Sequence, residues 1–477
     1  MLKKNPSIIK TAIFMVLILT INANAFSNIR LPNIIGSHMV LQQNTKVKIW
    51  GWGSPAEKVT IKASWDTTQY VTETDNGAKW STEILTPKAG GPFTINISGA
   101  NTIVLDDVMV GEVWVCSGQS NMEWSGDQGL QQTINEAPNA TNTKIRFFYV
   151  PKSTSEYPQE NMDAKWVVCN PEDMKHFSAI GYFFGKNLQA NLNSPIGLIN
   201  SNWGGTPAET WTPEYVINAN PIIKKGASTL QNFPWWSSKT AITYNAMIAP
   251  LTNYSIAGVV WYQGESNTAS HYAYEQLFTG MIDAWRIAWK TDFPFYFMQI
   301  APFAYEHQNI GALLRETQTK AALHANTGMV VLSDLVPDTN NIHPTRKIEV
   351  AERLSNLALH NTYGFSQIIA NGPMYKSFGV EKDKVTIQFD NIGGGLICKD
   401  KEISQFQIAG ADKIFLPAQA RIIGNTIVVT NKNIKNPIAV RYSFSNTAIG
   451  NVYNKEGLPL NLFRTDDWEV NTDEIKK

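Results

Sequence analysis

The chain has 477 residues, which is enough for about three domains of ordinary size. Its 40 basic residues equal its 40 acidic residues in number, so no positive excess is available to hold a nucleic-acid backbone. Charged residues make up only 17% of the chain and hydrophobic residues 43%, a composition that excludes extensive disorder. We therefore expect a folded protein that does not bind nucleic acid.

Residues 1–25 have the pattern of a secretory signal peptide. Lys3 and Lys4 precede an apolar run over residues 12–19, and the small residues that a signal peptidase accepts follow at 23–25. The alternative is a membrane anchor, but this run is far shorter than the roughly 20 residues that a spanning helix needs. We predict cleavage after residue 25 and an exported protein, periplasmic or extracellular, without a membrane span.

The chain has three cysteines, Cys116, Cys169 and Cys398. Because three is an odd number, at least one is unpaired unless it joins another chain, and disulfides are not expected to be the main framework. No two cysteines have C-x-x-C spacing and no two of the seven histidines have H-x-x-x-H spacing. The sequence therefore gives no support for a metal site.

Short runs that alternate apolar and polar residues predict β structure at both ends of the mature chain. They occur at 47–50, 59–62 and 93–97, with turn signals at Asn76-Gly77 and Gly90-Gly91, and again at 385–389, 427–429 and 440–442. We predict an N-terminal antiparallel β domain at 26–107 and a C-terminal β module at about 370–470.

Between these modules, apolar strand-like runs alternate with stretches of helical period, a pattern typical of parallel strands joined by crossover helices. The predicted strands are 108–116, 145–150, 196–200, 256–262, 294–300 and 328–333, and the clearest helices are near 180–188, 277–285 and 344–361. We predict a three-layer α/β domain at 108–362, with a possible insertion at about 207–245. In such sheets, ligands bind beyond the carboxyl ends of the strands.

The first of these strands ends in a polar turn that contains Ser120. Gly118 gives the chain freedom to turn sharply there, which would place Ser120 where a nucleophile should stand. The alternative is that Ser120 and Asn121 only cap a helix.

Two further strand ends are rich in glycine and amide residues, at 199–206 and 261–267. The backbone amides of Gly204 and Gly205 can approach a developing oxyanion closely, and the side chains of Gln263 or Asn267 can donate from one side. The alternative is that the paired glycines simply form a tight loop.

The last predicted strand runs into a polar loop that contains His343. Asp334 and Asp338 lie in the same loop, and either carboxylate could hold the imidazole as the base of a nucleophilic hydrolase requires. A solitary loop histidine is otherwise an ordinary surface group. All these signals fall at strand ends of one predicted sheet, and together they favour a single active site.

Four segments carry a family resemblance: GQSNMEW at 118–124, WGGT at 203–206, WYQGESN at 261–267 and IHP at 342–344. Together they resemble the sialate O-acetylesterase family of the SGNH hydrolases, over nearly the whole mature chain. The resemblance implies a flavodoxin-like three-layer core with N-terminal and C-terminal β-sandwich-like modules. It also implies an esterase that removes O-acetyl groups from sialic acids or related acetylated sugars.

By this resemblance Ser120 is the nucleophile, His343 is the base, and Gly204 or Gly205 is a backbone oxyanion donor. Gln263 takes the position of the side-chain donor, with Asn267 as second choice.

The chain departs from the family pattern at the acid, because Asn340 occupies the usual position three residues before His343. We favour Asp338 as the acid, with Asp334 or a Ser-His pair without an acid left open. Glu265 is a further possibility, although an ionised carboxylate beside the oxyanion donors would disfavour the developing anion.

The implied reaction forms an acetyl-enzyme on Ser120 and needs no metal or cofactor. Since the base must be neutral, activity should fall in acid near the unperturbed histidine pKa of about 6.5. Trp124, Trp203 and Tyr262 are candidates for contact with a sugar ring, although core packing is the alternative.

Arg315 could pair with a sialate carboxylate, or be a helix-surface cation. Two competing functions remain at this stage. One is an acetylesterase of acetylated xylan or another plant polysaccharide, and the other is a carbohydrate-binding protein with an inert core.

Overall fold

A central sheet of mostly parallel strands organises the molecule, for which a computed structural model describes residues 28–231 and 238–475. The strands follow the order β13-β12-β11-β7-β10-β8-β9, and only β9 runs antiparallel to its neighbour. Their bounds are β7 (Thr102–Gly118), β8 (Asn142–Tyr149), β9 (Trp166–Cys169), β10 (Ile196–Asn202), β11 (Gly258–Tyr262), β12 (Phe295–Met298) and β13 (Thr327–Val330). The six strands predicted between 108 and 333 are present, and the short edge strand β9 is an addition.

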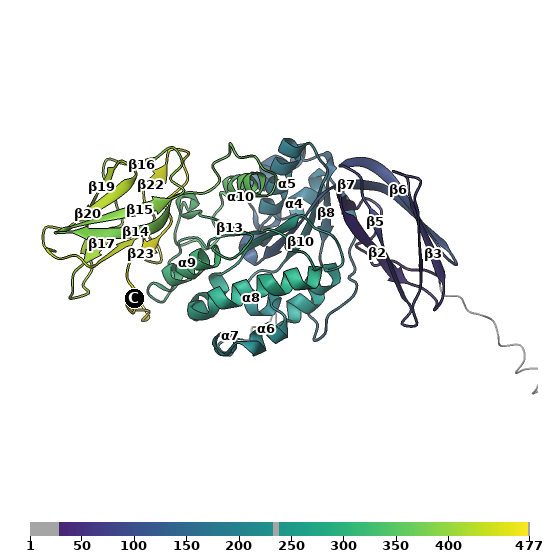
Figure 1. Ribbon diagram of the computed structural model, residues 1–477, viewed down its shortest axis with the longest axis horizontal. Helices are drawn as coiled ribbons and strands as arrows, with labels where there is room; N and C mark the ends of the chain where they lie inside the picture. The colour runs from purple at the N-terminus through teal and green to yellow at the C-terminus, as the bar shows by residue number, and fades with distance from the viewer. Residues whose placement is uncertain (1–27, 232–237, 476–477) are drawn as a thin grey trace, which may run out of the picture.

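Helices cover both faces of this sheet (Figure 1). Alternate residues of β7 separate the two cores: Val113 and Val115 pack in the core that contains α8 (His271–Trp289) and α9 (Ile310–Ala321). Trp114 and Cys116 pack in the core that contains α5 (Ala179–Leu192) and α10 (Lys347–Asn361). The expected three layers are present, because successive side chains of a strand point to opposite faces.

The sheet contains the flavodoxin-like strand order that the resemblance implied, with two strands added at one edge. Numbered along the chain, β7, β10, β11, β12 and β13 lie in the order 2-1-3-4-5 of a flavodoxin-like sheet, and β8 and β9 lie outside β10. The chain therefore passes from β10 on one side of β7 to β11 on the other. The loops after β7, β10 and β11 all start at the same edge of the sheet, where a ligand crevice is expected.

β7 joins the N-terminal module to the core without a linker. Its first half pairs with β6 and β1, and its second half pairs with β10 and β11. The boundary predicted at 107/108 therefore falls inside one continuous strand, since pairing along β7 does not stop there. The other strands of this module are β1 (Val40–Gln42), β2 (Lys46–Trp52), β3 (Lys58–Ala63), β4 (Gln69–Glu73), β5 (Lys79–Leu85) and β6 (Gly90–Ser98).

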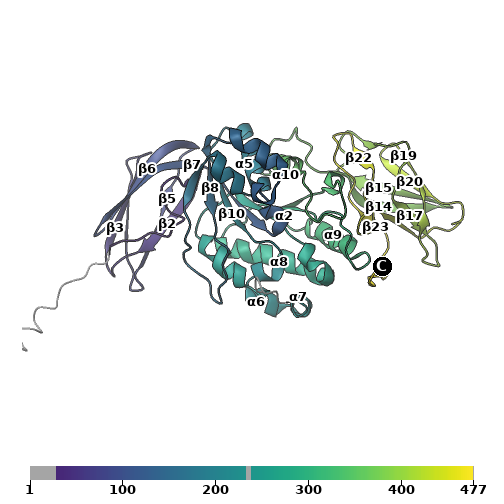
Figure 2. The same cartoon turned by 180° about the vertical axis from the view of Figure 1, so that it is seen from behind.

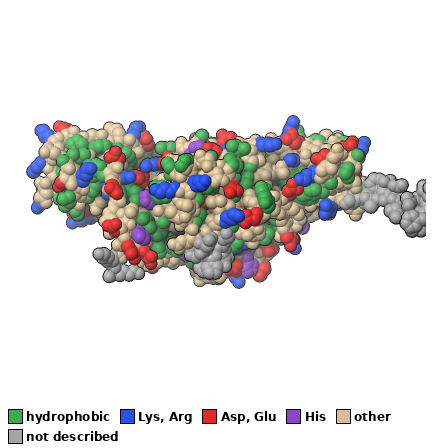
Figure 3. Space-filling model, turned by 90° about the horizontal axis from the view of Figure 1, so that it is seen from below, with side chains coloured by type: hydrophobic (Ala, Val, Ile, Leu, Met, Phe, Trp, Pro, Cys, Tyr) green, Lys and Arg blue, Asp and Glu red, His purple; other side chains and the backbone are tan. Residues whose placement is uncertain are grey.

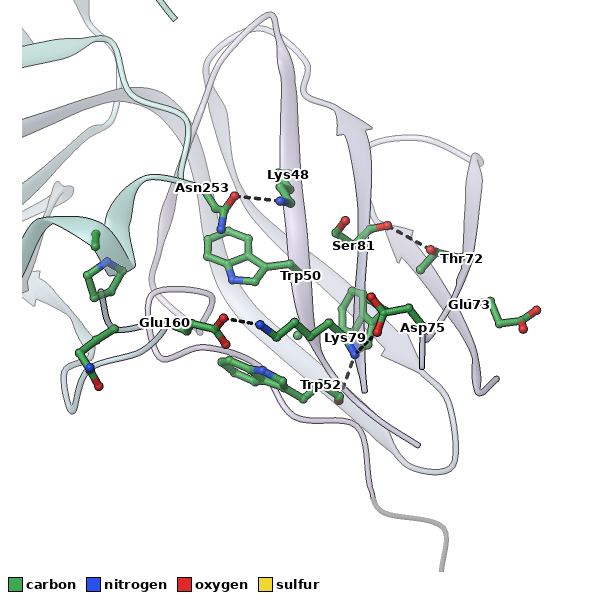
Figure 4. A pocket seen from close by; sticks show the side chains of 15 residues that line it. Lys48, Trp50, Trp52, Thr72, Glu73, Asp75, Lys79, Ser81, Glu160 and Asn253 are labelled. Carbon is green, nitrogen blue, oxygen red and sulfur yellow. Dashed lines mark hydrogen bonds and ion pairs between the residues drawn. The ribbon is translucent and has the colours of Figure 1, made fainter. Parts of the chain in front are cut away.

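A cavity of about 450 Å³ lies between the N-terminal module and the core (Figure 4). The half-buried Trp52 lines it, an ion pair between Lys79 and Glu160 lies at its edge, and Lys48 donates a hydrogen bond of 2.8 Å to Asn253. Asn253 precedes β11, so the cavity borders the end of the sheet at which the parallel strands begin. It is therefore not part of the crevice at the strand ends.

The C-terminal module consists of antiparallel strands that share one apolar core. Two four-stranded sheets have the orders β14-β15-β20-β19 and β18-β17-β21-β23, and β16 pairs with β22. The bounds are β14 (Met374–Glu381), β15 (Lys384–Asp390), β16 (Leu396–Cys398), β17 (Phe406–Ala409), β18 (Leu416–Pro417), β19 (Gln419–Ile423), β20 (Thr426–Thr430), β21 (Ala439–Tyr442), β22 (Val452–Asn454) and β23 (Phe463–Arg464). These strands lie within the span predicted from the sequence.

The segment predicted as an insertion, 207–245, contains several short helices among its described residues. It contains η3 (Ala208–Trp211), α6 (Glu214–Ala219), α7 (Pro221–Ala227) and the start of η4 (Tyr244–Ile248), and both α6 and α7 contact α8. The remaining short helices are α2 (Ser120–Glu123), η1 (Gly126–Gln128), α3 (Gln131–Glu136), η2 (Ala137–Asn139), α4 (Pro171–His176), η5 (Ala249–Leu251), η6 (Glu265–Ser270) and η7 (Ser333–Leu335).

The predicted signal peptide, 1–25, lies outside the described residues. Across the two described ranges, no helix combines the length and the apolar character that crossing a bilayer requires. The three cysteines are all free thiols, two of them buried.

Candidate active site

Ser120 and His343 meet above the carboxyl ends of the central strands. The Ser120 hydroxyl oxygen lies 2.9 Å from Nε2 of His343. Ser120 is the first residue of α2, which lies beside β10 (Figure 2). The turn before it depends on Gly118, whose φ is +132° and whose added Cβ would lie 2.2 Å from the carbonyl oxygen of Tyr262. Glycine is needed there because any side chain would collide with β11 and strain the backbone.

The imidazole of His343 is half-buried and held mainly by packing. Its ring stacks on Trp124 with centroids 4.5 Å apart, and its backbone N–H donates to the side-chain oxygen of Asn341. Burial, and to a smaller extent the positive charge of Lys347, lower the pKa of His343 to about 4, against an opposing effect of Glu123. The base is therefore neutral over most of the pH range, which differs from the value near 6.5 that the sequence suggested.

Neither aspartate that we expected to support His343 contacts it. Asp338 is exposed, and its carboxylate accepts hydrogen bonds from the backbone and side-chain amides of Asn340. Asp334 forms a two-point ion pair with Arg353. Within 28–231 and 238–475, no carboxylate forms a hydrogen bond or ion pair with His343. The expectation of an acid in this loop is thus corrected: the loop carboxylates have nearer partners.

A buried polar cluster links the serine turn to the histidine loop. Asn121 donates from Nδ2 to Glu265 at 2.7 Å and to the carbonyl oxygen of Ile342 at 3.0 Å, and its Oδ1 accepts from Lys347 at 2.6 Å. Burial raises the pKa of Glu265 and lowers the pKa of Lys347 to about 7. Sequence reasoning considered Asn121 only as a cap and Lys347 not at all. The one sequence signal for this cluster was that Asn121 and Glu265 both lie in the quoted motifs.

The two glycines expected to donate to an oxyanion lie beside the serine but differ in their partners. A Cβ on Gly204 would lie 3.3 Å from Cβ of Ser120. Its N–H donates to the carboxylate of Glu123 at 2.6 Å, and Glu123 also pairs with Lys152. For the N–H of Gly205, the described parts of the chain offer no hydrogen-bond acceptor. Gly205 is the better candidate because its amide has no competing protein partner.

The side chains of Gln263 and Asn267 are used inside the protein. Nε2 of Gln263 donates to Oδ1 of Asn267 at 2.7 Å and to the carbonyl oxygen of Thr206 at 3.3 Å. Nδ2 of Asn267 donates to the buried carboxylate of Glu209 at 2.8 Å. Both amides are fully buried. The expectation that either donates to an oxyanion is corrected, because these donors hold the loops after β10 and β11 together.

Of the three residues expected to contact a sugar, two are accessible at the site and one is buried in the core. Trp124 and Trp203 are only partly buried, and the backbone N–H of Trp203 donates to the carbonyl oxygen of Gly118 beside the serine turn. Tyr262, by contrast, is 1% exposed, and its ring lies under Lys347. The two tryptophans therefore stay candidates for sugar contact, whereas Tyr262 is a core residue.

Arg315 is not a surface cation. It is 1% exposed, and its guanidinium donates to carbonyl oxygens of Gly311, Ser445 and Asn446. Gly311 lies on α9 itself, and the bonds to Ser445 and Asn446 attach α9 to the C-terminal module. The expectation that Arg315 pairs with a sialate carboxylate is corrected, because the group is buried and its donors have protein acceptors.

The site has the arrangement of a serine hydrolase. Its serine lies within hydrogen-bond reach of a histidine, above the strand ends of an α/β sheet and beside glycine amides. Among the known proteins that this chain is similar to are sialate O-acetylesterases and a carbohydrate acetylesterase. A family model described as carbohydrate esterase, sialic acid-specific acetylesterase, matches residues 110–359. The human sialate O-acetylesterase is 31% identical over 396 residues, covering 75% of this chain and 76% of the human protein. The mouse sialate O-acetylesterase is 29% identical, covering 76% and 79%.

A crystal structure of a carbohydrate acetylesterase from Xanthomonas citri matches with a TM-score of 0.84 at 32% identity. The match covers 92% of this chain and 100% of that one. The chain belongs to the sialic acid-specific acetylesterase family of carbohydrate esterases, and it is a carboxylic ester hydrolase.

Proposed function

We propose that this protein removes O-acetyl groups from sugars, with Ser120 as nucleophile and His343 as general base, on the core of an SGNH hydrolase. The observation that carries the proposal is the 2.9 Å contact between Ser120 Oγ and His343 Nε2, two atoms whose residues are 223 positions apart in the chain. Family membership indicates that the bond broken is an ester, and this contact gives the nucleophile a base that can take its proton.

The proposed reaction depends on proton transfer between Ser120 and His343. His343 Nε2 takes the proton of Ser120 as Oγ attacks the acetyl carbonyl carbon, which gives a tetrahedral oxyanion. The bond from carbon to the sugar oxygen then breaks, and His343 returns the proton to that oxygen. A water molecule attacks the acetyl-serine in the same way, and acetate leaves with Ser120 restored.

The oxyanion needs donors that are already in place. The N–H of Ser120 is in the first turn of α2 and has no partner within the helix, and the N–H of Gly205 is the second donor. No acid takes part in this scheme. The ring of His343 is oriented by Trp124 and by its loop.

Two substrate classes fit this centre, O-acetylated sialic acids and neutral acetylated polysaccharides such as acetylxylan. The names of the mammalian relatives favour the first. The burial of Arg315 favours the second, because it removes the one cation that we expected to recognise a sialate carboxylate.

The test is acetate release from an O-acetylated sialic acid and from acetylated xylan. The purified protein should release acetate from at least one, and Ser120→Ala should lower the rate by more than about 10³-fold. Ser377→Ala, a partly exposed serine on β14 in the C-terminal module, is the matched control and should retain full activity. If the protein binds acetylated glycans without turnover, it is a carbohydrate-binding protein and the proposal is wrong.

Export belongs to the same proposal. The charged and apolar pattern of residues 1–25 supports a cleaved signal peptide. N-terminal sequencing of the mature protein should begin at Phe26, and an intact Met1 in the processed protein would contradict it.

A further inference from the structure

The cluster of Asn121, Lys347 and Glu265 has no part in the reaction as written, yet it is a buried polar cluster directly beside Ser120 and His343. Asn121 and Lys347 are each 1% exposed and Glu265 is 7% exposed. Burying a lysine and a glutamate is costly unless both are paired and hydrogen-bonded. Their contacts run through one amide, since Lys347 donates to Oδ1 of Asn121 and Glu265 accepts from its Nδ2.

Asn121 also connects the two segments that carry the proposed dyad. Asn121 follows Ser120, and its Nδ2 also donates to the carbonyl oxygen of Ile342, which precedes His343. One amide thus joins the segment of the nucleophile to the segment of the base. A lysine has donors only, so Lys347 requires the amide oxygen to face it and leaves the NH₂ group for Glu265 and Ile342.

We infer that Asn121 is a positioning residue for the proposed dyad, that Lys347 and Glu265 orient its amide, and that this unit holds His343 in place of the absent acid. The inference rests on the proposed function, because it concerns the same Ser120–His343 pair. This unit differs from an acid in the charge that it places near His343. An acid would stabilise the imidazolium, whereas Lys347 brings a positive charge toward the ring.

The charged and titratable groups that the described residues place near Lys347 come from several elements. Glu265 lies on η6, the ring of Tyr262 on β11 is 5.4 Å from Nζ, and Tyr305 interacts with the Glu265 charge. Toward His343, Lys347 lowers the imidazole pKa and Glu123 on α2 raises it. Below about pH 7, the value to which burial lowers the pKa of Lys347, the lysine is charged. Its effect on His343 is therefore fully present in acid, where the base would otherwise become protonated.

The positioning role is tested with Asn121→Asp, which has nearly the same shape. The carboxylate accepts from Lys347 but cannot donate to Glu265 or Ile342. We expect kcat to fall by about 10²-fold, the typical effect of a misplaced catalytic group, with KM little changed. Labelling of Ser120 by a fluorophosphonate should slow in parallel. An unchanged kcat would overturn the role of Asn121.

The electrostatic role is tested with Lys347→Met combined with Glu265→Gln, which removes both charges together and so leaves neither one buried alone. Glu265→Gln keeps an oxygen that accepts from Asn121. The acid limb of kcat/KM should move to higher pH than in the unmodified protein, because His343 loses a neighbouring positive charge. Lys224→Met, an exposed lysine in the last turn of α7, should leave the profile unchanged.

An unmoved acid limb in the folded double variant would overturn the role of Lys347. These outcomes are separate from the failure of the proposed function. If Ser120→Ala retains acetate release, the dyad itself is wrong. If Ser120→Ala is inactive and the cluster variants behave as the unmodified protein, only this inference is wrong.

Discussion

His343 illustrates how a residue's surroundings change the chemistry that its identity suggests. A free histidine is half protonated near pH 6.5. Here burial removes water from the charged form and Lys347 repels it, so the pKa is lowered to about 4. The sequence could locate the base but could not give its pKa, because the loop pattern shows neither the burial of the ring nor that Lys347, a residue in the next helix, is buried near it.

This setting predicts activity well into the acid range. The base is active only when neutral, and a lowered pKa keeps it neutral until the pH falls to that value. Acetate release should therefore be level from neutral pH down to about 5 and fall as the pH passes about 4. A profile of kcat/KM between pH 3.5 and 8, with circular dichroism at each pH to confirm folding, checks this. A fall centred near pH 6.5 would contradict the burial of the base.

The amide residues show the limit of prediction at this scale. Ser120 and His343 were predicted because strand ends in such a sheet converge at one edge. Gln263 and Asn121 both lie at that edge, and the sequence suggested Gln263 as the amide that takes part in the chemistry. Gln263 is bonded within the loops, whereas Asn121 bridges serine and histidine. Which neighbour an amide meets depends on the packed loops, and no local pattern carries that information.

At the scale of elements, the junction between β7 and α2 depends on one glycine. Gly118 has a φ of +132° and backbone atoms of Tyr262 in the space of a Cβ. Gly118→Ala should lower stability by about 1–3 kcal/mol from the backbone conformation alone, and the collision adds to this. Calorimetry should show a lower melting temperature and assays a lower kcat.

Gly379→Ala on β14 is the control for this change, because nothing lies within 4 Å of a Cβ built there. Equal melting temperatures for the two variants would show that the turn does not need its glycine.

Elements with a clear period were predictable, and those shaped by the site were not. The six core strands follow from apolar runs, and α5 and α8 from helical spacing. The helix predicted from residue 344 begins instead at Lys347. The segment before Lys347 carries His343. Its carbonyl oxygen at Ile342 accepts a hydrogen bond from Asn121, so this backbone group is bonded to the site and not within a helix. The four residues of β9 are too few to show a period.

At the scale of the whole molecule, three parts lie in a row, with the α/β core between the two β modules (Figure 1). Basic and acidic side chains are interspersed on the face seen in Figure 3, in keeping with zero formal net charge. The composition predicted this balance. The continuity of β7 and the attachment of the C-terminal module were not predictable, because both depend on pairing between distant segments.

Arg315 provides the sharpest test of that attachment. Its guanidinium supplies hydrogens to carbonyl oxygens of Ser445 and Asn446 from within α9, and Arg464 and Glu316 form an ion pair nearby. Arg315→Gln should cost about 1–3 kcal/mol for each buried carbonyl left without a donor, and so lower the melting temperature. Arg421→Gln, an exposed arginine on β19, should not.

The kinetic comparison separates this structural role from substrate recognition. Because Arg315 is buried, its loss should change KM for an O-acetylated sialic acid and for acetylated xylan to the same small extent. A selective rise in KM for the carboxylate-bearing sugar, at an unchanged melting temperature, would restore Arg315 as a substrate contact. The docking of the C-terminal module would then have to depend on the ion pair between Arg464 and Glu316 and on the apolar contacts of Phe444 and Leu462 with α9.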